Sequence, residues 1–187
     1  GEQQTLNIYR SVRTLPRPEA YWEDVKTCRE APRFHRSAEE LYEAICSGAE
    51  SGWDFSTRWL EAGAGRGGSS AKLVTADTCN VIPVDLNSLL YGMERTLAEF
   101  HRSLASPASA ERFEAAASLR SQTMEAWLWT GNSYRDYRLD VNAPSAVVSI
   151  ADWAAPLWVG LHGPGGQAAG VMLASLEESG LLRLGGC

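Results

Sequence analysis

The chain has 187 residues, a length typical of one domain. Hydrophobic residues make up 44% and charged residues 21%, which is enough apolar material for a core and excludes disorder along the whole chain. The formal net charge of −6 argues against a nucleic-acid partner, because binding to phosphates requires a basic surface. No run of apolar residues is long enough to form a membrane span.

The first predicted elements are two helices. A helix from Glu19 to about Glu30 is expected, because Pro18 occupies its first turn and acidic residues follow. Ser37 and Glu40 have the spacing of a capping box. This box predicts the start of a second helix, which ends near Gly48.

Residues 62–70 are rich in glycine and serine and predict a flexible surface loop. A phosphate-binding interpretation has only weak support, because no Lys-Ser or Lys-Thr pair follows the glycines. A long helix is expected after Pro83, with Asp85 as a plausible N-cap. Its apolar residues recur at spacings that mostly fit one helix face: Leu86, Leu89, Leu90, Met93, Leu97 and Phe100. A second long helix follows Pro107.

The last third of the chain predicts a turn region with short extended pieces over 131–142, followed by two helices over 151–161 and 167–179. Strands have little support beyond 146–150 and, more weakly, 72–75. The pattern as a whole is all-α, with paired helices joined by loops of unequal length. Functional residues tend to lie on such loops above a rigid scaffold.

Cysteine, histidine and tryptophan give little further indication of function. The four cysteines are scattered, without a C-x-x-C pair or a histidine at ligand spacing, so no metal site is predicted. Ordinary thiols are a better interpretation than a disulfide. The seven tryptophans suit either sugar stacking or a core, and their number alone favours the core.

The densest polar and aromatic cluster is residues 50–59, where Asp54 lies between Trp53 and Phe55. A glycosidase needs a carboxylic acid that stays protonated near neutral pH, and apolar surroundings raise the pKa of a carboxyl group. The competing interpretation is that Asp54 caps a helix or pairs with Arg58 four residues later. These residues taken alone favour the competing interpretation.

A second cluster is residues 16–21, Pro-Arg-Pro-Glu-Ala-Tyr. Two prolines stiffen the backbone around Arg17, so this side chain is presented at low entropic cost. Arg17 and Glu19 together suit binding of sugar hydroxyls. The alternative is a salt-bridged helix start, which these residues taken alone also favour.

Five segments, in order, resemble the conserved blocks of trehalases. Residues 16–25 are similar to P-R-P-E-S-Y-x-x-D-V, and residues 48–60 nearly repeat G-A-E-S-G-W-D-F-S-S-R-W. Residues 82–90 resemble V-P-V-D-L-N-x-L-L, and residues 129–139 resemble a shortened W-x-x-x-x-G-x-W-x-D-Y-D-L. Residues 156–160 resemble P-L-W/F-x-G. Five ordered matches are far more specific than any one motif.

The resemblance implies part of an (α/α)6 toroid, an incomplete ring of paired helices. It implies hydrolysis of α,α-trehalose to two glucose molecules with inversion, without a metal or another cofactor. By this resemblance Asp54 is the general acid. Arg17, Pro18 and Glu19 contact the sugar, and Gly52 lines the site.

The departures from the family pattern limit what the chain is expected to do alone. The upstream P-G-G-R-F block, the downstream Q-W-D block and the later glutamate that serves as general base have no match. We therefore expect residues 1–187 to form a single partial catalytic domain that is inactive by itself. Tyr134 stands where the family often has tryptophan, and Arg138 replaces an acidic residue.

Two further expectations follow. The alternative function is a non-catalytic sugar-binding or regulatory remnant of a trehalase fold. A partial ring should also expose apolar helix faces, which predicts low stability or self-association of the isolated chain.

Overall fold

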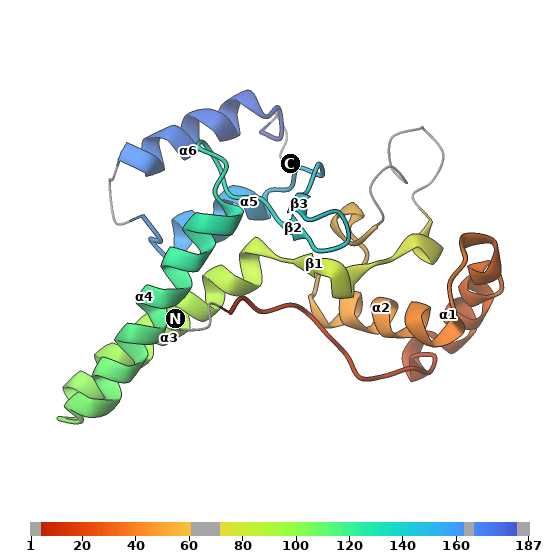
Figure 1. Ribbon diagram of the computed structural model, residues 1–187, viewed down its shortest axis with the longest axis horizontal. Coiled ribbons are helices and arrows are strands. Elements are labelled where there is room, and N and C mark those ends of the chain that lie inside the picture. Colours follow the sequence, from red (N-terminus) through yellow and green to blue (C-terminus); the bar gives the residue numbers. More distant parts are fainter. Residues whose placement is uncertain (1–4, 61–71, 163–166, 183–187) are drawn as a thin grey trace. The chain divides into compact units, whose positions relative to one another are not determined.

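The computed structural model describes residues 5–60, 72–162 and 167–182. These residues contain six α-helices and one small sheet, which confirms the all-α fold class. The chain divides into two compact units (Figure 1). The site unit comprises residues 8–82 and 138–147, and the hairpin unit comprises residues 1–7, 83–137 and 148–187.

The single partial catalytic domain over residues 1–187 stays a prediction. The flexible loop predicted near residues 62–70 lies outside the described residues.

In the site unit, α1 (Tyr21–Cys28) follows a short 3-10 turn, and α2 (Ala38–Glu50) begins at the predicted capping box. The Glu40 backbone N–H donates to Ser37 Oγ at 3.1 Å, and the Ser37 N–H donates to Glu40 Oε2 at 2.9 Å. This reciprocal pair satisfies two N–H groups that the first turn leaves without helical partners, so the start of α2 is fixed locally.

The core of the site unit forms on one face of α2. Leu41 and Ile45, four residues apart, are both fully buried. They belong to a cluster that joins α2 to the segments around it: Ala31, Leu41, Ala44, Ile45, Leu60, Val74 and Ala76. Burial of this face leaves the end of α2 as a rigid support for the loop that follows it.

The sheet has the order β1 (Val81–Ile82), β2 (Tyr137–Arg138) and β3 (Ala143–Pro144). The strands expected over 146–150 and 72–75 are therefore wrong. Leu73–Thr75 is a 3-10 helix, and 146–150 contains no strand. Both segments make short-range hydrogen bonds that compete with a ladder.

The hairpin unit is built on two long helices, α3 (Val84–Ser103) and α4 (Pro107–Leu128), which run side by side (Figure 1). Helix α5 (Ala151–Trp158) packs on α3, and α6 (Gln167–Glu178) packs on α5. No helix of the described ranges is long and apolar enough to cross a membrane.

Helix α3 begins differently from the prediction. Pro83 is its N-cap, and Asp85 lies in the first turn instead of capping it. Asp136 supplies the missing acceptor, because its Oδ1 receives the Val84 N–H at 2.9 Å. A carboxylate from a distant segment thus performs the capping role, which spacing within the helix does not reveal.

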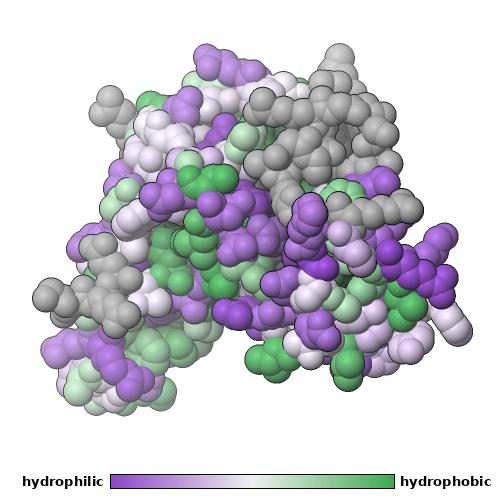
Figure 2. Space-filling view, turned by 45° about the vertical axis from the view of Figure 1, so that its right-hand side comes forward, coloured by the Kyte–Doolittle hydropathy of each residue, from purple (hydrophilic) through white to green (hydrophobic). Residues whose placement is uncertain are grey.

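The predicted apolar face of α3 is largely exposed. Leu89, Met93 and Phe100 are 44%, 50% and 60% exposed, whereas several polar residues are buried: Asp85, Asn87, Ser88 and Glu94. Hydrophobic residues are visible at the surface among hydrophilic ones (Figure 2). Helical periodicity identified a common face but not which side of the helix faces the core.

A polar cluster holds the buried side of α3 against α4. Arg120 donates to both carboxylate oxygens of Glu94 at 2.8 to 3.1 Å and to Asn87 Oδ1 at 3.1 Å. Asn87 also exchanges hydrogen bonds with the backbone of Asn7 at 2.9 Å. These partners satisfy polar groups that would otherwise be costly to bury.

Candidate active site

The loop that carries Asp54 begins at the end of α2. The helix ends at Glu50, and Gly52 has φ of +73°, in the left-handed region that glycine adopts without a Cβ clash. The Gly52 N–H donates to Ala49 O at 3.2 Å. This glycine turns the chain out of the helix and into the site loop.

The backbone on the N-terminal side of Asp54 is held by three hydrogen bonds at Trp53. Its N–H donates to Ser51 Oγ at 3.0 Å, and its carbonyl accepts from Ser56 N–H at 2.6 Å and Trp59 Nε1–H at 3.0 Å. The Asp54–Phe55 peptide bond that follows is cis.

The Asp54 side chain itself is exposed. Within the described part of the chain, no hydrogen bond or ion pair holds its carboxylate, and Ser56 caps the following 3-10 turn. The helix-cap and Arg58-pairing interpretations therefore do not describe this geometry. A carboxyl group on an anchored loop remains available to a ligand.

Arg17 is buried against a carboxylate that the motif places seven residues later. Its Nε and Nη2 donate to the two oxygens of Asp24 at 3.0 and 2.8 Å, and its backbone N–H donates to Asp24 Oδ2 at 2.9 Å. Asp24 is fully buried. The hydrogen bonds to Asp24 raise the pKa of Arg17, so its guanidinium stays positively charged. The salt-bridged helix start considered as an alternative is present.

Two motifs that are distant in sequence meet at Phe55. The guanidinium carbon of Arg17 lies 5.0 Å from the centre of the Phe55 ring. On α2, a Cβ added to Gly48 would lie only 3.1 Å from Phe55 Cε1, so the glycine permits close packing of the ring. The Pro-Arg-Pro-Glu segment and the residue after Asp54 are thus in direct contact.

Three of the predicted substrate-binding residues line one hollow of about 350 Å³. Its lining consists of charged and small side chains: Ser11, Arg13, Arg17, Pro18, Glu19, Cys46, Ala49 and Glu50. Guanidinium and carboxylate groups can donate to and accept from sugar hydroxyls. Asp54 and Gly52, although described, do not line this hollow, so the five predicted residues occupy two adjoining segments of the unit.

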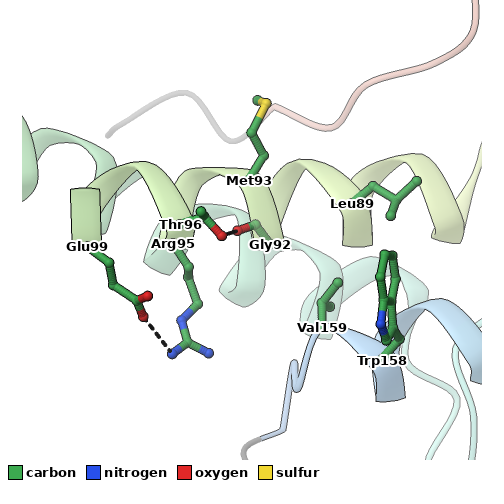
Figure 3. A pocket seen from close by; sticks show the side chains of 8 residues that line it. All are labelled: Leu89, Gly92, Met93, Arg95, Thr96, Glu99, Trp158 and Val159. Carbon is green, nitrogen blue, oxygen red and sulfur yellow. Dashed lines mark hydrogen bonds and ion pairs between the residues drawn. The ribbon is translucent and has the colours of Figure 1, made fainter. Parts of the chain in front are cut away.

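A hollow of about 430 Å³ on the hairpin unit has a different character (Figure 3). Apolar and polar side chains both line it: Leu89, Gly92, Met93, Arg95, Thr96, Glu99, Trp158 and Val159. Leu89 points toward Trp158, and the only ion pair drawn joins Arg95 to Glu99 at 3.9 Å. It contains none of the predicted site residues and few converging polar groups.

No group of three or more metal-ligating side chains occurs within residues 5–60, 72–162 and 167–182. Sequence reasoning missed Asp24, Gly48 and Arg58 as supports of the site. Asp24 was visible as the aspartate of the first motif, and Arg58 as the arginine between two tryptophans. Gly48 gave no signal, because its role depends on a ring seven residues away.

Comparison with known proteins identifies the family. The trehalase family model matches residues 1–187. The chain is 35% identical over 183 residues to the periplasmic trehalase of Salmonella schwarzengrund, covering 97% of this chain and 30% of that protein. It is 40% identical over 136 residues to the periplasmic trehalase of Citrobacter koseri, covering 72% of this chain and 22% of that protein. The chain thus spans less than a third of the length of these curated relatives, and it belongs to the trehalase family.

Proposed function

We propose that the whole protein hydrolyses α,α-trehalose to two glucose molecules with inversion, and that Asp54 is its general acid. The observation that carries this proposal is an exposed carboxyl on an anchored loop in contact with the Arg17 segment. Arg17, Pro18 and Glu19 would bind sugar hydroxyls, and Gly52 would shape the loop. The described helices would form part of an (α/α)6 toroid.

The reaction requires a second carboxylate. A general base activates water, which attacks the anomeric carbon of one glucose as the bond to the bridging oxygen breaks. Asp54 gives its proton to that oxygen, and the base takes the proton of the water. One product is β-glucose and the other α-glucose. No segment of residues 1–187 matches the family block of the base, so we assign the base to another part of the whole protein.

The test replaces Asp54 in the protein at the full length of its relatives. Asp54→Asn keeps the side-chain volume and removes the proton donor, so kcat on trehalose should fall by about 10²–10⁴-fold. Glu111→Gln on the exposed surface of α4 is the matched control and should keep full activity. Undiminished hydrolysis by Asp54→Asn would refute the assignment.

Residues 1–187 alone should release no glucose from trehalose. Full activity of this chain would show that the base lies within it. Trehalose binding by the full-length protein without hydrolysis would favour the sugar-binding remnant, the alternative function.

A further inference from the structure

Asp54 lies between two aromatic residues, and each of them stacks on a buried arginine. The Arg17 guanidinium carbon lies 5.0 Å from the Phe55 ring centre, and that of Arg58 lies 5.0 Å from the Trp53 ring centre. The two arginines are 8% and 1% exposed. Charged groups of this kind are rarely buried unless something in the structure holds them.

The stack on the C-terminal side is held by Asp24 and by close packing of the Phe55 ring on α2. Asp24 accepts two hydrogen bonds from the Arg17 guanidinium, which orient it over Phe55, and a third from the Arg17 backbone N–H. The ring also lies so close to Gly48 of α2 that a Cβ added there would be 3.1 Å from Phe55 Cε1. Phe55 therefore contacts both the backbone of α2 and an oriented cation.

The stack on the N-terminal side is fixed in a similar way. Arg58 lies over Trp59 as well, at 4.6 Å, and Trp59 is fully buried. The Trp59 indole N–H donates to the backbone carbonyl of Trp53 at 3.0 Å. The ring and the backbone of Trp53 are thus both tied to the same buried pair.

We propose that Arg58 and the Arg17–Asp24 pair are positioning residues that clamp Asp54 through Trp53 and Phe55. This inference rests on the proposed function of Asp54. The clamp fixes the backbone on both sides of the acid, while its carboxyl stays exposed to substrate. Since Arg17 also lines the hollow, it links sugar binding to the placement of the proton donor.

The decisive variants alter neither Asp54 nor a residue that lines the hollow. Phe55→Leu removes the ring under Arg17, and Arg58→Met removes the cation over Trp53. A displacement of about 1 Å at a catalytic group costs about 10²-fold in rate, so kcat on trehalose should fall by about that factor with little change in KM. Phe55→Tyr and Arg58→Lys keep a ring and a cation and should restore most of kcat.

A second substrate separates misplacement of the acid from a general defect. Departure of fluoride from α-glucosyl fluoride needs little protonation, so its hydrolysis should fall less than about threefold in the same variants. Equal losses on the two substrates, or no loss on trehalose, would overturn the proposal. Arg112→Met, which removes an exposed arginine 4.7 Å from the Phe113 ring on α4, is the matched control and should leave both rates unchanged.

The clamp can still be tested if a variant does not fold or if the full-length protein is inactive. If Arg58→Met does not fold, Phe55→Leu decides, because Phe55 is apolar and 37% exposed. If the unaltered full-length protein hydrolyses neither substrate, the proposed function fails, and backbone ¹⁵N relaxation of residues 53–55 in this chain tests the clamp. Order parameters should then drop from about 0.85 to below about 0.6 in Phe55→Leu, and unchanged values would refute the clamp.

Discussion

The two compact units use their main helices in opposite ways. In the site unit, α2 buries Leu41 and Ile45 on one face, as an amphipathic helix in a core does. In the hairpin unit, α3 buries polar groups such as Asn87 and Glu94 and exposes Met93 and Phe100. The site unit therefore follows ordinary helix patterning, and the hairpin unit reverses it along α3.

The two units also differ in where the residues that support them lie. The groups that anchor Asp54 all have their partners inside the site unit, including Asp24 for Arg17 and Trp59 for Trp53. On the apolar face of α3, α5 packs against part of the helix, but Leu89, Met93 and Phe100 stay exposed among the described residues. We therefore expect the site geometry to be internally supported, and the exposed face of α3 to depend on further protein.

The largest expected effect comes from breaking a polar anchor within the site unit. Arg138 is 2% exposed and donates to both oxygens of Asp140, to Asp77 Oδ2 at 2.8 Å and to Leu60 O at 3.0 Å. Arg138→Met leaves these acceptors without their cation, so the free energy of unfolding should fall by about 3 kcal/mol. Urea denaturation followed by circular dichroism measures this loss.

The control is an exposed ion pair of the hairpin unit. Arg95 and Glu99 are 3.9 Å apart, and their side chains are 49% and 62% exposed. Arg95→Met should change the unfolding free energy by less than about 0.5 kcal/mol. Equal losses in the two variants would show that the site unit does not depend on its buried anchors. Arg138→Asp should be at least as harmful, because it adds a third carboxylate beside Asp77 and Asp140.

The sequence predicted much of the local structure. The capping box at Ser37, the two long helices and the all-α class follow from spacing alone, since their signals lie within one or two turns. The family resemblance implies that Asp54 and Arg17 belong to one site, which stays a prediction. The structure shows the Arg17–Phe55 stack, a contact between residues 38 positions apart that no local pattern reveals.

The predictions that failed depended on tertiary partners. The sequence predicts Asp85 as the N-cap of α3, but Asp136, from a distant segment, accepts the hydrogen bond from the Val84 N–H. The apolar spacing of α3 was correctly identified, but the side of the helix that faces the core depends on Arg120 of α4 pairing with Glu94. Packing between elements decides such cases over local propensity.

The exposed face of α3 predicts self-association of the isolated chain. Leu89 and Met93 lie four residues apart beside Trp158, which is 78% exposed. A lysine at Met93 would carry a charge into any apolar contact at this face, so Met93→Lys should weaken self-association at least about tenfold, or about 1.4 kcal/mol. Sedimentation velocity over a range of concentrations measures the effect.

A lysine elsewhere on the same unit provides the comparison. Ser118 of α4 is exposed, and Ser118→Lys adds the same charge without removing apolar surface. It should leave the association constant nearly unchanged. A sharp, concentration-independent melt of a monomeric wild-type chain would contradict the prediction.

A smaller effect is expected at the turn that starts the site loop. Gly52 has φ of +73°, and nothing lies within 4 Å of a Cβ added there. Gly52→Ala therefore meets backbone strain without a steric clash, and should cost about 1 kcal/mol of unfolding free energy. Gly170→Ala within α6 also meets open space but has ordinary helical φ, so it should be neutral or stabilising. If both variants lowered the unfolding free energy, or both raised it, the predicted strain at Gly52 would be wrong.

The smallest effect is a pH dependence in the site unit. Hydrogen bonds from Arg138 lower the pKa of Asp140 in the folded state. The stabilisation from this carboxylate is therefore present above its ordinary pKa of about 3.9 and is lost as pH falls through the lower folded value. Because the Asp140 side chain is 33% exposed, solvent screening keeps the contribution small.

The measurement compares the melting temperatures of the wild type and Asp140→Asn between pH 7 and pH 3. The wild type should be more stable at pH 7, and the difference should shrink at the acidic end, where the carboxylate becomes protonated. In an Arg138→Met background the same comparison should show a much smaller pH dependence, since the lowered pKa depends on Arg138. If the pH dependence persists without Arg138, another group lowers the pKa of Asp140. The Arg138–Asp140 ion pair would then not be what stabilises the site unit.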